Sequence, residues 1–133
     1  MPIIKNIFPG TDLYNDASAP SYSYVGNTLD IDIRVRNDFG NGTESSAAHC
    51  NPFTVKFYAS QNTTINPLWD TYLTSINASD MSGNSYQDLS VIIDPSAHGL
   101  IGDYYIGWVI DSENDVWERD NSNNTGYINS LFN

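Results

Sequence analysis

An uninterrupted alternation of apolar and charged residues is the feature that most restricts how this chain can fold. In Leu29-Asp30-Ile31-Asp32-Ile33-Arg34-Val35-Arg36 the two classes alternate at every position. Successive side chains of a β-strand point to opposite faces, so a strand would bury the apolar residues and leave the charges in water. A helix would scatter the same residues around its circumference. The segment 29–36 is therefore predicted to be a half-buried strand.

The same period recurs along the chain and predicts an all-β fold. Residues 53–59 and 88–93 alternate in the same way, and 104–110 is a denser apolar run typical of a central strand. Shorter candidate strands are residues 12–14, 69–73, 115–119 and 127–131. Clusters rich in Gly, Asn and Asp separate them and are typical of turns: 25–27, 38–42, 60–67, 79–85 and 120–124. Seven to eight strands divided in this way predict an immunoglobulin-like antiparallel β-sandwich.

The length of the chain fits one domain. A chain of 133 residues can bury a core without disulfides, and none can form within it because Cys50 is the single cysteine. Residues 1–10, which contain Pro2, Pro9 and Gly10, are predicted to be a lead-in segment. Residues 11–133 are predicted to form the domain.

The charge of the chain excludes two classes of partner. Sixteen acidic residues against five basic ones give a net charge of −11, which repels nucleic-acid phosphates and anionic lipid headgroups. No apolar run approaches the length of a membrane span, so membrane insertion is not expected. Such a surface attracts cations instead, and calcium is the hard cation that carboxylate and amide oxygens suit best.

The C-terminal third carries a motif that resembles a known family. Gly102-Asp103-Tyr104-Tyr105-Ile106-Gly107-Trp108-Val109-Ile110-Asp111 is followed by Asn114-Asp115-Val116, Glu118 and Asn123-Asn124. Together these resemble the signature of the bacterial cell-adhesion-related domain, the CARDB family. Three earlier stretches match the family in order: Asp12-Leu13, Val35 to Gly40 and Phe53 to Ser60. The resemblance spans about residues 11 to 131.

The resemblance implies architecture more than ligand. Members of the family are immunoglobulin-like sandwiches, usually repeated or attached to peptidases, adhesins and surface-layer proteins. It therefore implies a non-catalytic structural or adhesive module in a secreted or cell-surface protein of a prokaryote. The expected partners are neighbouring modules, surface proteins or glycans. An accessory domain of a secreted peptidase is an alternative. This chain differs from the family at two positions: Asn41 stands where the family often has Thr in a Gly-Thr-Gly turn, and Ser122 stands where Glu is common.

An oxygen-rich cluster near the C-terminus is the candidate metal site. Asp120-x-Ser122-x-Asn124 places oxygen ligands at alternate positions, as calcium loops do. The candidate calcium ligands are Asp111, Asp115, Glu118, Asp120, Ser122 and Asn124. No bidentate Glu follows at the spacing of an EF-hand. The competing interpretation, which the sequence favours, is turn chemistry, in which Asp111 shapes one turn and Asn124 bonds the backbone of another.

Aromatic residues suggest a second kind of site. Exposed rings can stack on sugars, so a carbohydrate-binding module is the alternative function, with Trp69, Trp117 and Tyr58 as the candidate glycan contacts. Trp108 stands in the densest apolar run and is predicted to lie in the core. The sequence contains no nucleophile elbow, no zinc-protease motif and no phosphate-binding glycine loop, so an enzyme is not expected.

Overall fold

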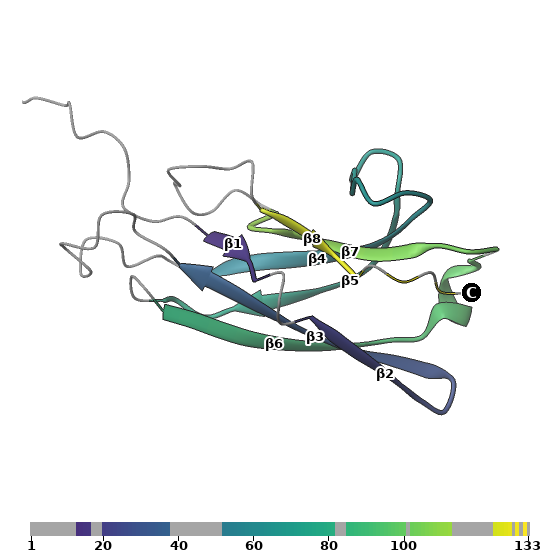
Figure 1. Ribbon diagram of the computed structural model, residues 1–133, viewed down its shortest axis with the longest axis horizontal. Coiled ribbons are helices and arrows are strands. Elements are labelled where there is room, and N and C mark those ends of the chain that lie inside the picture. The colour runs from purple at the N-terminus through teal and green to yellow at the C-terminus, as the bar shows by residue number, and fades with distance from the viewer. Residues whose placement is uncertain are drawn as a thin grey trace, which may run out of the picture.

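The computed structural model describes residues 13–16, 20–37, 52–81, 85–100, 102–112, 124–128, 130 and 132. These residues form two antiparallel sheets packed face to face, with strands running along the long axis (Figure 1). The predicted immunoglobulin-like β-sandwich is confirmed. No helix in the described residues is long and apolar enough to cross a membrane.

The first sheet is built around β3 (Thr28–Asn37), the strand with strict alternation. Along one edge β3 pairs over its whole length with β6 (Ser85–Ile93). Along the other edge two short strands lie end to end. There β2 (Ser21–Val25) pairs with the first half of β3, and β1 (Leu13–Asn15) pairs with its last residues.

The second sheet has the order β5-β4-β7-β8. Its central strands are β4 (Phe53–Ser60) and β7 (Tyr105–Ile110), and its edges are β5 (Thr71–Ala78) and β8 (Thr125–Tyr127). The pairing of β4 with β5 shifts register between Phe57 and Tyr58, which marks a β-bulge. A short 3₁₀ helix, η3 (Pro95–His98), connects β6 to β7 across the gap between the sheets.

The core lies between the inner faces of these sheets. Alternate residues of β3 point inward and are fully buried, as the alternation predicts, with Ile31 and Val35 both at 0% exposure. They meet Phe57 and Trp108 of the second sheet, whose rings lie 5.7 Å apart. The outer face of β3 carries the charges, and Arg34 there pairs with Asp88 of β6 at 2.7 Å. The burial of Trp108 confirms its predicted place in the core.

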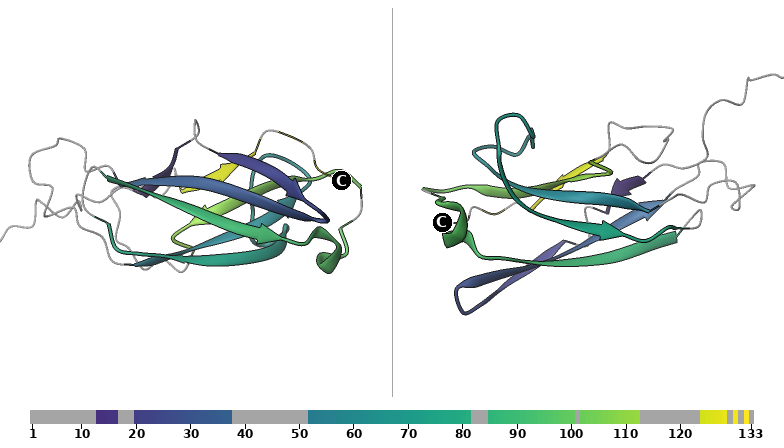
Figure 2. Two further views of the ribbon diagram at one scale, coloured as in Figure 1. Left: turned by 90° about the horizontal axis from the view of Figure 1, so that it is seen from below. Right: turned by 180° about the vertical axis from the view of Figure 1, so that it is seen from behind.

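The two ends of the sandwich are formed by different connections. At one end, here called the hairpin end, lie the β2–β3 turn, loop 61–70, η3 and residues 99, 100 and 102–104. The β2–β3 hairpin diverges from the second sheet there (Figures 1 and 2). At the other end, here called the β7–β8 end, β7 stops at Ile110 and β8 begins at Thr125.

Some strands differ from the sequence prediction. The sequence analysis missed β2 altogether, placed β5 two residues early and ended it at Leu73, whereas it continues to Ala78. The candidate strand at 115–119 lies outside the described residues, as do the lead-in segment 1–10 and the turn at 38–42. The domain boundary at residue 11 therefore stays a prediction.

Candidate functional site

Asp111 is the first residue after β7 and has an unusual backbone. Its φ is 58°, in the left-handed region, and no other non-glycine residue of the described chain has a positive φ. Asp tolerates this conformation better than most residues because its short polar side chain can bond locally. The residue is also 5% exposed, so it lies at a tightly packed position where β7 ends.

Asn124 lies at the other end of the connection between β7 and β8, which begins at Asp111. Its backbone carbonyl accepts a hydrogen bond from Ile110 N at 2.7 Å, and its Nδ2 donates to Ile110 O at 3.3 Å. The next residue after Asp111, Ser112, is fixed in turn because its N donates to Thr54 O at 2.9 Å. Asn124 thus makes the kind of backbone hydrogen bond that turn chemistry assigns to it.

Asp111 follows Ile110 in the chain, and Asn124 is hydrogen-bonded to Ile110, so both lie at the β7–β8 end. These two are the only candidate calcium ligands within the described residues. The other four, Asp115, Glu118, Asp120 and Ser122, lie outside them, as does Trp117. In the part of the chain that is described, no three His, Cys, Asp or Glu side chains are grouped closely enough to hold a metal ion.

The two described glycan candidates lie in very different surroundings. Trp69, in loop 61–70, is 81% exposed, as a stacking residue must be. Tyr58 is 6% exposed, so its place on an exposed platform was wrong. The bulge at Phe57 and Tyr58 and the packing of Tyr58 against Tyr72, with ring centroids 5.9 Å apart, account for its burial.

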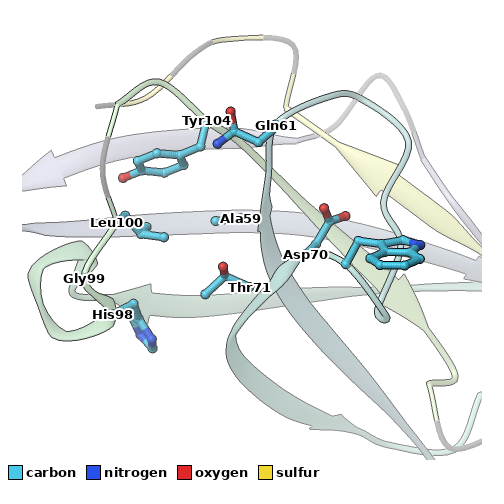
Figure 3. Close-up of a pocket in the computed structure, with 9 residues that line it drawn as sticks. Ala59, Gln61, Asp70, Thr71, His98, Gly99, Leu100 and Tyr104 are labelled. Carbon is cyan, nitrogen blue, oxygen red and sulfur yellow. The ribbon is translucent and has the colours of Figure 1, made fainter.

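A hollow lies beside Trp69 at the hairpin end (Figure 3). Its volume is about 220 Å³. Gln61 and Tyr104 lie along one side of it and His98 lies across from them, with Thr71 between. Burial raises the pKa of Tyr104 above its ordinary value of 10.0, so this hydroxyl keeps its proton at neutral pH.

Comparison with known proteins decides the family. The family model for CARDB matches residues 10–127. The chain belongs to the CARDB family. Comparison by sequence with curated proteins finds no match.

Solved structures support the same CARDB fold. A CARDB domain from Pyrococcus furiosus, determined in complex with di-metal ions, is 17% identical, with a TM-score of 0.61. The match covers 91% of this chain and 92% of that one. β-Glucosidase 3B from Thermotoga neapolitana (14% identity, TM-score 0.53) matches 92% of this chain, which corresponds to 16% of the enzyme. A β-glucosidase from Bifidobacterium adolescentis (12% identity, TM-score 0.54) matches 89%, or 17% of that enzyme.

The sequence analysis of this CARDB domain missed the lining of the hollow beside Trp69. The lining comes from β4, loop 61–70, the start of β5 and the connection between β6 and β7, which are far apart in the sequence. Gln61, Thr71 and His98 carry no motif that would have joined them. The one available signal was the pair of adjacent large apolar residues, Leu68 and Trp69, within a turn-forming segment.

Proposed function

We propose that this domain is a non-catalytic structural or adhesive module of a secreted or cell-surface protein, and that calcium stabilises its β7–β8 end. The observation that carries the cation proposal is the burial of both Asp111 and Asn124, which stand at the two ends of one acidic connection. Neighbouring modules or surface proteins are the proposed partners.

The fold supports a module that presents surfaces rather than one that performs chemistry. The sandwich is filled with apolar side chains, and the paired charges of Arg34 and Asp88 lie on an outer face. The CARDB family is a small non-catalytic type of domain. The same fold also forms a minor part of larger glucosidases, which is consistent with use as one component of a longer protein.

The residues at the β7–β8 end fit a hard cation in their chemistry. Asp111, which is 5% exposed, supplies a carboxylate, the ligand type that calcium prefers. Asn124 supplies an amide oxygen at the other end of the connection. Between them the sequence supplies further carboxylates at Asp115, Glu118 and Asp120.

Calcium suits this set because it takes about six to eight oxygen ligands, including amide and hydroxyl oxygens. Asp111 and Asn124 alone would be too few, so a complete site requires ligands from the connection between residues 112 and 124. The relative from Pyrococcus furiosus, described as a complex with di-metal ions, supports metal binding as a property to test here.

Thermal unfolding in EDTA and in millimolar calcium tests the proposal. Calcium at a hundredfold excess over Kd adds about 2.7 kcal/mol to the free energy of unfolding, which raises Tm by roughly 5–10 °C for a domain of this size. Asp111→Asn tolerates the left-handed backbone but lacks the charge, so its Tm should be the same in EDTA and in calcium. The matched control is Asp103→Asn, at the hairpin end, which should keep the rise. Equal Tm values in calcium and EDTA for the unchanged domain would contradict the proposal.

A further inference from the structure

Loop 61–70 at the hairpin end is fixed by its own hydrogen bonds. Asp70 Oδ2 accepts from Asn66 N at 2.6 Å, and Asn66 Oδ1 accepts from Leu68 N at 3.0 Å. The backbone of Asn66 also accepts from the amides of Trp69 and Asp70. Ile65 anchors the loop, since it is 8% exposed and lies where a side chain on Gly107 would have to go. The loop therefore has a defined shape before any ligand arrives.

This fixed loop displays Trp69 at 81% exposure. A large apolar ring in water is unfavourable, and exposed apolar surface often marks a binding site. The hydrogen bonds of loop 61–70 fix the backbone that carries Trp69 at the edge of the hollow. A loop that is fixed before binding loses little conformational freedom when a ligand stacks on its ring.

The hollow beside Trp69 is lined by groups that both donate and accept hydrogen bonds. Gln61 supplies a carboxamide, Asp70 a carboxylate, Thr71 a hydroxyl and His98 an imidazole (Figure 3). Sugar hydroxyls also donate and accept at once. Their C–H faces pack on aromatic rings, whose faces are electron-rich. A tryptophan beside such polar groups fits one sugar ring.

A second hollow lies next to the first. Its volume is about 400 Å³, and it extends to Tyr24 and Pro95. Leu100 and Tyr104 line both hollows, so the two are adjacent across these side chains. Tyr24, which is 56% exposed on the β2–β3 hairpin, provides a ring beside the second hollow, as Trp69 does beside the first. The two adjacent hollows together are here called the end groove.

We propose that the end groove binds a neutral oligosaccharide, with one sugar stacked on Trp69 and another on Tyr24. Two adjacent hollows with one exposed ring each favour a chain of several sugars over a single one. The net charge of −11 and the carboxylate of Asp70 in the lining disfavour uronic acid and sulfated glycans. This site lies at the end of the sandwich opposite Asp111 and does not depend on the calcium proposal.

Calorimetry with defined sugars tests the proposal. The probes are cellohexaose, xylohexaose, mannohexaose and laminarihexaose, each titrated into the domain beside its disaccharide. We expect at least one hexasaccharide to bind with saturation, and its disaccharide to bind at least about tenfold more weakly because it cannot reach both rings. No binding by any of the four would overturn the proposal. Equal affinity for the disaccharide and the hexasaccharide would overturn the second sugar position.

Substitutions at two neighbouring residues distinguish stacking on the ring from nonspecific hydrophobic binding. Trp69→Ala should weaken hexasaccharide binding about tenfold or more, since aromatic contacts contribute roughly that factor. Leu68→Ala is the matched control, because Leu68 is 84% exposed on the same loop but does not line the hollow. It should leave the affinity unchanged. If both substitutions weaken binding equally, or neither does, Trp69 is not a sugar platform and the proposal is wrong.

Discussion

Trp108 of β7 donates a hydrogen bond from its indole Nε1 to Asn15 Oδ1 of β1 at 3.1 Å, and so joins the two sheets through the core. Trp108 is fully buried, and its N–H would otherwise have no water to bond. The contact fixes the short strand β1 across the sandwich. The first prediction concerns this bond.

Asn15→Leu should lower the free energy of unfolding by about 1–3 kcal/mol, because it leaves the indole N–H of Trp108 without its acceptor. Urea unfolding measures this loss. In a Trp108→Phe background, where the donor is gone, Asn15→Leu should cost less. An equal cost in both backgrounds would show that the hydrogen bond contributes nothing and that Asn15 acts through packing alone.

Gly126 of β8 leaves room for the same contact. A Cβ at this position would lie 2.5 Å from Asn15 Cγ and 2.6 Å from Trp108 Nε1. Gly126→Ala should therefore lower the free energy of unfolding by about 1–3 kcal/mol through overpacking. Thr125→Ala, at the exposed neighbouring residue, is the control and should change it by less than about 0.5 kcal/mol. Equal effects of the two substitutions would refute the crowding argument.

These contacts show what the sequence could predict and what it could not. The alternation in β3 determines its inward face, so this strand was predicted from its own pattern. The sandwich was predicted from the recurrence of that pattern in other segments and the turns between them. β2 has the weaker alternation Ser21-Tyr22-Ser23-Tyr24 and was missed because it is short and ends in a turn signal. Tyr58 was misplaced because a bulge and a packed neighbour bury it, and both are tertiary effects. The end groove gathers residues from several connections, which no local pattern joins.

The ion pair on the outer face of the first sheet makes stability depend on pH. The hydrogen bond from Arg34 lowers the pKa of Asp88 below its ordinary value of 3.8. The carboxylate is thus favoured in the folded state, and its contribution is present above pH 3.8 and lost as the pH falls through the lowered pKa. NMR titration should find the Asp88 pKa depressed in the unchanged domain and restored by Arg34→Gln. An unchanged Asp88 pKa in this variant would contradict the assignment.

Asp70 should control the rigidity of loop 61–70. Asp70→Ala removes the acceptor for Asn66 N, which should raise amide hydrogen exchange at Asn66. The Trp108 amide, in a central strand, is the internal reference and should exchange as before. Exchange at Asn66 that stays as slow as in the unchanged domain would show that other contacts, such as the burial of Ile65, suffice to hold the loop.

Calcium titration by calorimetry tests the central proposal most directly, because it measures binding itself. The proposed site predicts saturable calcium binding by the unchanged domain and by Asp103→Asn, and its loss in Asp111→Asn, which keeps the size and backbone preference of the residue. Absence of calcium binding to the unchanged domain, or equal binding by Asp111→Asn, would contradict a metal site at the β7–β8 end. Asp111 and Asn124 would then serve only to shape the turn that follows β7.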